Sequence, residues 1–165
     1  MPILDAHTLE FFSRSPEQTR RLGMRLGGLL ETGDAICLEG ELGAGKTTLV
    51  QGMAQGWGSL DAVSSPTFVL VNVYCRPDEA RLFHLDAYRL ESAPEAEEMD
   101  VDTLLGQGPL VVEWPERIQP ILPEDRLWVR LEYVSEEGRQ MKFSACGARY
   151  DGLLAEFRQS VFGVE

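Results

Sequence analysis

The chain has 165 residues, 44% of them hydrophobic, which suits one compact domain spanning residues 1–165. Its formal net charge is −12 and its only lysines are Lys46 and Lys142, so it lacks the basic surface by which proteins usually hold RNA or anionic membranes. Its apolar runs are too short to span a bilayer, and the N-terminus lacks a secretory pattern, which together predict a cytoplasmic protein with no membrane partner.

The chain begins with a predicted edge strand over residues 7–12 and then a helix. Ser15 suits the N-cap of that helix, and Pro16 suits its first position. Gly33 is expected to end it. Leucines at helical spacing predict its core face: Leu22, Leu26, Leu29 and Leu30.

Strands and helices then alternate along the chain, which predicts an α/β protein with layers around a central sheet. The last two strands are joined by a turn at residues 136–138, so a C-terminal hairpin should make the sheet mixed, although mainly parallel. A variable C-terminal helix is expected within residues 149–165. Strands are predicted at 34–39, 68–75, 81–86, 110–113, 127–133 and 140–146, and helices from 47 to 57, 94 to 105 and 150 to 161.

Residues 40–47 match the G-x-x-x-x-G-K-[ST] phosphate loop in full. Its glycines allow backbone N–H groups to face phosphate oxygens, and the following helix adds its positive dipole end. Lys46 would reach the β- and γ-phosphates, and Thr47 would offer its hydroxyl to Mg²⁺. An apolar strand before the loop and a helix after it supply the context that the motif needs. These features predict a P-loop NTPase-like fold that binds a nucleotide with magnesium.

Two strands end in a carboxylate that could lie beside this loop. Asp86 closes the strand over 81–86, and Glu113 closes the strand over 110–113. Ligands in open α/β sheets lie at the carboxyl ends of strands, and Mg²⁺ prefers hard oxygen ligands. We therefore expect both carboxylates near the metal, while an ordinary surface acid after a strand is the alternative for either one.

Three further side chains could belong to the site. Thr67 could close on the metal as a switch threonine does, although Ser-Pro before it equally suits a plain turn. His84 fits a hydrogen-bonded structural histidine better than a catalytic base. Trp114 follows Glu113 directly, so it would lie beside the site even if it belongs to the core. The three cysteines, Cys37, Cys75 and Cys146, are too scattered for a zinc site and are expected to be buried thiols.

Four segments together resemble the TsaE (YjeE) family of small bacterial ATPases. They are residues 38–48, 65–68, 84–89 and 112–115, and they occur in the order and spacing of the family. The resemblance implies a weak Mg-dependent ATPase that is required for N6-threonylcarbamoylation of adenosine 37 in tRNAs reading codons that start with A. It implies TsaD and TsaB as partners, with tRNA contacted only indirectly.

The resemblance also implies roles for individual residues. Lys46 and Thr48 would hold phosphate together with the backbone of the loop, and Asp86 would lie near the metal. The catalytic residues expected are Lys46, Asp86 and Glu113. Mg²⁺ would be bound by Thr47 and Glu113. The nucleotide-binding residues implied are Gly43, Ala44, Gly45, Lys46, Thr47, Thr48, Thr19 at a helix start near the nucleoside and Arg139 in the late hairpin.

Other P-loop proteins offer competing explanations. A small-molecule kinase has the same loop and size but usually carries an arginine-rich lid, and no compact arginine cluster is visible in the sequence. A regulatory GTPase needs an Asn-Lys-x-Asp segment, and neither lysine follows an asparagine. A scaffold with a purely structural nucleotide is the third possibility.

Overall fold

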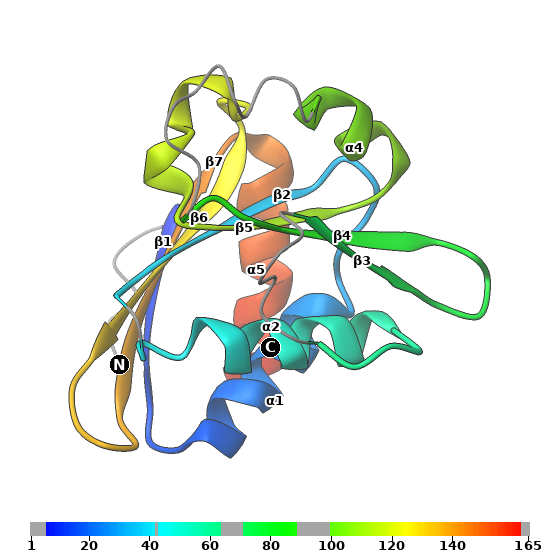
Figure 1. Ribbon diagram of the computed structural model, residues 1–165. Coiled ribbons are helices and arrows are strands. Elements are labelled where there is room, and N and C mark those ends of the chain that lie inside the picture. The colour runs from blue at the N-terminus through cyan, green and yellow to red at the C-terminus, as the bar shows by residue number, and fades with distance from the viewer. Residues whose placement is uncertain (1–5, 42, 64–70, 89–99, 163–165) are drawn as a thin grey trace.

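The fold is built on one mixed seven-stranded sheet. The computed structural model describes residues 6–41, 43–63, 71–88 and 100–162 (Figure 1). The strands lie in the order β1-β7-β6-β2-β5-β4-β3. Pairing is parallel from β6 through β2 and β5 to β4, and antiparallel at both edges. The strand bounds are β1 Thr8–Ser13, β2 Ala35–Glu39, β3 Val71–Cys75, β4 Arg81–Asp86, β5 Leu110–Glu113, β6 Arg126–Tyr133 and β7 Arg139–Cys146.

The central strands are apolar because both faces of the sheet are covered. Helices α1 (Pro16–Gly27), α2 (Lys46–Trp57) and α5 (Ala148–Phe162) pack on one face, and α4 (Val101–Gln107) with two short 3₁₀ turns packs on the other (Figure 1). Along β2, Ile36 and Leu38 enter the first core whereas Cys37 enters the second, as strand alternation requires. The predicted mixed α/β fold and its C-terminal hairpin are confirmed. Within the described residues, no helix is both long and apolar enough to cross a bilayer.

Helices α1 and α2 touch through glycines. A Cβ added at Gly27 would lie 2.0 Å from the carbonyl oxygen of Met53, and one at Gly56 would lie 2.0 Å from that of Met24. Gly23 and Gly52 are equally crowded against the facing backbone. Each helix therefore carries two glycines four residues apart, which bring the backbones into direct contact. This contact fixes α1 against the helix that begins at the phosphate loop.

Two helix boundaries differ from the sequence expectations. Helix α1 ends at Gly27 with Gly28 as C-cap, so Gly33 does not end it. Gly33, with φ +96°, instead forms a turn that lets the Asp34 carboxylate accept a hydrogen bond from the Glu31 N–H at 2.7 Å. A continuous helix from 94 to 105 is also wrong, because Asp100 has φ 52° and caps the separate helix α4. Residues 94–99 lie outside the described residues.

The cysteines occupy unlike surroundings. Cys37 is buried, and burial raises the pKa of its thiol to about 12. Cys75 and Cys146 are exposed, so the expectation of buried thiols is wrong for these two. Both lie at the ends of strands, where the last side chain extends beyond the packed core.

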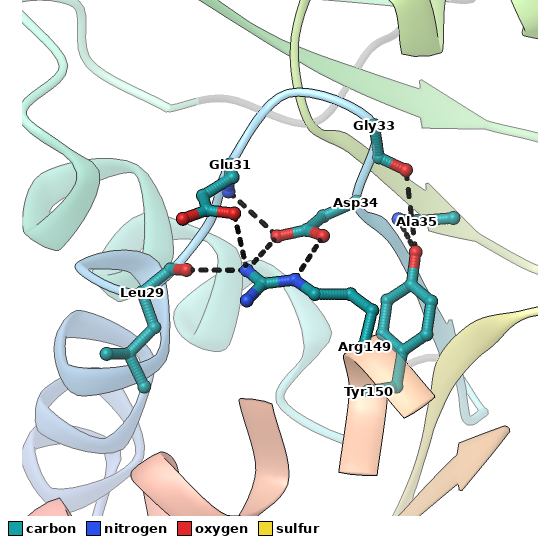
Figure 2. Close-up of polar contacts among 7 residues, drawn as sticks. All are labelled: Leu29, Glu31, Gly33, Asp34, Ala35, Arg149 and Tyr150. Carbon is teal, nitrogen blue, oxygen red and sulfur yellow. Dashed lines mark hydrogen bonds and ion pairs between the residues drawn. The ribbon is translucent and has the colours of Figure 1, made fainter. Parts of the chain in front are cut away.

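A polar cluster fastens α5 to the turn before β2 (Figure 2). Arg149 donates to both oxygens of Asp34, from Nε at 2.9 Å and from Nη2 at 2.7 Å. The same Nη2 donates to the carbonyl oxygen of Leu29 at 3.0 Å. The Tyr150 hydroxyl accepts from the Ala35 N–H at 2.8 Å. We call Asp34, Arg149 and Tyr150 the α5 clasp.

Candidate nucleotide site

The phosphate loop connects β2 to α2 at the carboxyl end of the sheet. Gly43 has φ +83° and Gly45 has φ +100°, which are conformations that glycine adopts without strain. Gly45 is the N-cap of α2 and has no side chain to cap it, so the first amides of the helix are left to face a ligand. Ala44 packs into the core with 1% of its surface exposed. Ala44 thus anchors the loop in the core, and the uncapped backbone N–H groups at the start of α2 are available to a ligand.

Lys46 begins α2 and is buried, with 5% of its surface exposed. Its Nζ donates to the carbonyl oxygen of Gly40 at 2.5 Å and lies 3.9 Å from the centroid of the Trp114 ring. Burial lowers the pKa of this amine, while the charges of Glu113 and Asp86 oppose that effect. Among the described residues, no carboxylate lies within ion-pair distance of Lys46. Within the described residues, the amine is therefore a buried cation whose direct partners are a carbonyl and a ring, with the two carboxylates further away.

Asp86 and Glu113 end neighbouring parallel strands and are in register with each other. Burial raises the pKa of the Asp86 carboxyl, the backbone N–H of Tyr88 opposes that shift, and the charge of Glu113 adds to it. Glu113 is more deeply buried, with 5% exposed, and β2 pairs it with Leu38 just before the phosphate loop. The structure thus brings the two carboxylates predicted from the sequence together beside the loop.

Behind Glu113 lies a buried histidine. His84 has 0% of its surface exposed, and its Nε2 lies 2.6 Å from Oε2 of Glu113. Its Nδ1 lies 2.9 Å from the hydroxyl of Tyr74 on the edge strand β3. His84 is thus hydrogen-bonded through both ring nitrogens. Tyr74 was not predicted from the sequence to lie near the site. Its position diagonal to His84 follows from the β3–β4 pairing.

Aromatic side chains flank the loop on the side of β5. Trp114 has φ 59°, a left-handed conformation that bulky residues seldom adopt, and its ring packs 4.9 Å from that of Tyr88. The backbone turn at Trp114 places its indole over Lys46. The sequence predicted that Trp114 lies beside the site, but it gave no reason to expect the ring of Tyr88 there.

The late hairpin approaches the phosphate loop from the other side. Arg139 donates from Nε to the carbonyl oxygen of Gly43 at 3.1 Å. It lines a cavity of about 30 Å³ together with Thr19, Gly45 and Thr48. Thr19 is 1% exposed and its hydroxyl bonds that of Ser13 at 2.6 Å, so it lies at the loop but is already partnered. These four residues gather around the start of α2.

The oxygen-rich donors of this site suit magnesium. Thr47 in α2 and Glu113 in β5 are hard oxygen donors, and Mg²⁺ commonly takes only one or two protein carboxylates beside water and phosphate. The described part of the chain has no group of three or more His, Cys, Asp and Glu residues that could enclose a metal by itself. Thr67, which could be a switch threonine or part of a plain turn, lies outside the described residues. The donor set therefore fits a metal that is shared with a phosphate ligand.

Comparison with known proteins places the chain in a family. The family model for the threonylcarbamoyl adenosine biosynthesis protein TsaE matches residues 13–141. A Bacillus subtilis protein named for tRNA threonylcarbamoyladenosine biosynthesis, TsaE, is 36% identical over 90% of this chain and 92% of its own length. Its Streptomyces coelicolor namesake is 43% identical over 79% of this chain and 93% of its own length.

A solved structure agrees with these sequence matches. The crystal structure of Bacillus subtilis YdiB superposes with a TM-score of 0.77 at 30% sequence identity, covering 93% of this chain and 96% of that one. The region that the family model matches, residues 13–141, contains the phosphate loop, both strand-end carboxylates, β6 and the first residues of β7. The chain belongs to the TsaE family of threonylcarbamoyl adenosine biosynthesis proteins.

Proposed function

We propose that this protein is the ATP-binding and weakly ATP-hydrolysing subunit of a complex that makes threonylcarbamoyladenosine at position 37 of tRNA. The observation that carries the proposal is the buried Lys46 at the start of α2, which faces the paired carboxylates Asp86 and Glu113. Burial penalises the charge of this amine, and a bound triphosphate would supply an anion in direct contact with it. Membership of the TsaE family supports the tRNA-modification role.

Each residue of the site has a proposed task. Backbone amides from Gly43 to Thr48 and the amine of Lys46 bind phosphate oxygens. Thr47 and Glu113 would hold Mg²⁺, and the bound metal would neutralise part of the charge on the phosphates. Asp86 and Glu113 are the carboxylates available to orient the attacking water. Arg139, which already bonds the loop at Gly43, keeps the loop in its binding shape.

The acidic surface suits a subunit that acts through partners. The net charge of −12 disfavours direct tRNA binding, so TsaD and TsaB are proposed to hold the RNA while this subunit supplies the ATPase. Its own hydrolysis is proposed to be weak, because on this account it serves to reset the complex between turnovers.

The test is reconstitution with a matched lysine control. The protein is mixed with a TsaD–TsaB pair, tRNA, ATP and the threonylcarbamoyl donor, and modified tRNA is counted per complex. Lys46→Ala should reduce the count to one turnover or fewer, whereas Lys142→Ala, on the exposed face of β7, should match the native protein. Equal counts for native and Lys46→Ala protein would contradict the proposal. Fast phosphoryl transfer to a small metabolite would instead favour a P-loop kinase.

A further inference from the structure

We propose that Tyr74 and His84 are positioning residues that orient the Glu113 carboxylate through a buried hydrogen-bond relay. The relay crosses three neighbouring strands, with Tyr74 on β3, His84 on β4 and Glu113 on β5. The inference rests on the proposed function, since it assigns Glu113 to the metal side of the nucleotide site. It adds two residues that touch neither phosphate nor metal.

The proposed relay runs in one direction, from Tyr74 through His84 to Glu113. An ionised carboxylate only accepts hydrogen bonds, so the 2.6 Å contact requires a proton on Nε2 of His84. In the relay that we propose, the ring is the neutral Nε2–H tautomer, so Nδ1 is an acceptor and the Tyr74 hydroxyl donates to it across 2.9 Å. Asn72 Nδ2 lies 3.5 Å from the Tyr74 oxygen on its acceptor side, in line with the same direction. Every hydrogen bond in the relay thus points toward Glu113.

Burial makes the relay rigid. His84 is 0% exposed, Tyr74 is 3% exposed and Glu113 is 5% exposed, so water cannot readily replace any partner. The rings of Tyr74 and His84 also pack with centroids 5.9 Å apart. The carboxylate is therefore held by one oxygen from behind.

The other carboxylate oxygen of Glu113, Oε1, is available to a ligand of the nucleotide site. Among the described residues, no hydrogen bond reaches Oε1 of Glu113, whereas Oε2 is bonded to His84. A histidine that fixes one carboxylate oxygen leaves the second in a set direction, as partners behind metal ligands commonly do. The structural alternative is that His84 only compensates a buried charge, in which case the orientation of the carboxylate would not matter.

Two amide substitutions separate these alternatives. The amide nitrogen of glutamine can take the place of Nε2, whereas that of asparagine takes the place of Nδ1. His84→Gln should therefore keep kcat of the reconstituted ATPase within about fivefold of native, and His84→Asn should lower it about 10- to 100-fold. Tyr74→Phe, which keeps the ring and removes the donor, should have an intermediate effect. KM for ATP should stay within about twofold in all three variants, because the phosphate contacts are untouched.

A second readout does not depend on hydrolysis. The chain has two histidines, so ¹⁵N NMR of the imidazoles gives two ring systems, and His7→Gln assigns them. His84 should show a proton on Nε2 alone, Tyr74→Phe should shift its Nδ1 signal, and addition of MgADP should shift its Nε2 signal. The MgADP shift should be absent in Glu113→Gln, in which the carboxylate is replaced by an amide.

The outcomes of these experiments distinguish failure of the relay from failure of the proposed function. A proton on Nδ1 instead of Nε2, or equal kcat for His84→Gln and His84→Asn at equal melting temperature, would overturn the relay. An unmoved Nε2 signal, when calorimetry shows that MgADP binds, would also overturn it. Failure of tRNA modification with a normal MgADP shift would count against the proposed function and leave the relay standing.

Discussion

The two ends of strand β2 both hold buried charges, but they compensate them in opposite ways. At the amino end, the Asp34 carboxylate accepts two hydrogen bonds from Arg149 and one from the Glu31 N–H (Figure 2). At the carboxyl end, the direct contacts of the Lys46 amine with described residues are the carbonyl oxygen of Gly40 and the Trp114 ring, and no carboxylate among them is within ion-pair distance. A buried charge whose hydrogen bonds are satisfied within the protein stabilises the fold. A buried charge that is incompletely paired can gain free energy when a ligand of opposite charge binds.

The pKa shifts follow the same division. At the α5 clasp, the hydrogen bonds to Asp34 raise the pKa of Arg149 further above its ordinary value, because they favour the charged form. At the nucleotide site, burial shifts the pKa of Lys46 downward and that of Asp86 upward, because it penalises both charged forms. The charges of the α5 clasp are stabilised without a ligand, whereas those of the nucleotide site would be stabilised most by a bound triphosphate and its metal.

The largest effect on folding should come from breaking the clasp. Arg149→Met leaves the Asp34 carboxylate, 3% exposed, without its cation, and should lower the free energy of unfolding by about 3 kcal/mol. The matched control is Arg130→Met, which breaks an exposed pair with Glu132 and should cost less than about 1 kcal/mol. Urea unfolding measures both. A loss no greater than that of the control would contradict the difference between the two ends.

The opposite pattern is expected at the nucleotide site, where a substitution should reduce ATP hydrolysis with little change in the free energy of unfolding. Lys46→Met removes the incompletely paired cation, so the free energy of unfolding should change by no more than about 1 kcal/mol, because burial already penalises the charge. Hydrolysis of ATP in the reconstituted complex should fall about 100-fold. Lys142→Met is the control and should leave both quantities unchanged. A variant that is as unstable as Arg149→Met would show that Lys46 serves the fold.

A smaller effect should follow from removing one hydroxyl of the clasp. Tyr150→Phe leaves the buried N–H of Ala35 without its partner and should cost about 1–2 kcal/mol of unfolding free energy. Affinity for MgATP should be unchanged, because Tyr150 lies at the opposite end of β2. Urea unfolding and calorimetry test the two parts, and a change in nucleotide affinity would mean that the two ends communicate.

The smallest predicted effect is a labelling rate at Cys37, midway along β2. Because burial raises the pKa of this thiol to about 12, a thiol reagent at pH 8 should modify only Cys75 and Cys146 in the native protein. Cys37 should react only when the strand opens, and therefore faster in Arg149→Met than in Lys46→Met. Mass spectrometry of the modified chain counts the thiols, and three modified thiols in the folded native protein would contradict the account.

The two ends also differ in how far the sequence predicts them. The phosphate loop is contiguous, and Asp86 and Glu113 each close an apolar strand, so pattern and strand order bring them together. The clasp joins Asp34 to Arg149 across 115 positions of sequence, and neither residue belongs to a local motif. Such a pairing depends on how α5 crosses the sheet, which periodicity does not fix.

The predicted end of helix α1 was also wrong. The leucine spacing continues past Gly27, but the helix ends there with Gly28 as its C-cap. Gly27 lies against the backbone of Met53 in α2. The glycine pairs in α1 and α2 were present in the sequence, yet glycine in a helix usually lowers helix propensity, so their spacing did not suggest a contact. The glycine contact is a feature of tertiary packing, which helix propensity does not predict.

The most direct test of the central claim is a calorimetric titration of MgATP into three proteins below their unfolding temperatures. The account predicts one site in the native protein, an affinity within about threefold of native in Arg149→Met, and an affinity about 100-fold weaker in Lys46→Met, which is about 2.7 kcal/mol. Binding by Lys46→Met that equals native binding, or a loss in Arg149→Met as large as that in Lys46→Met, would contradict it.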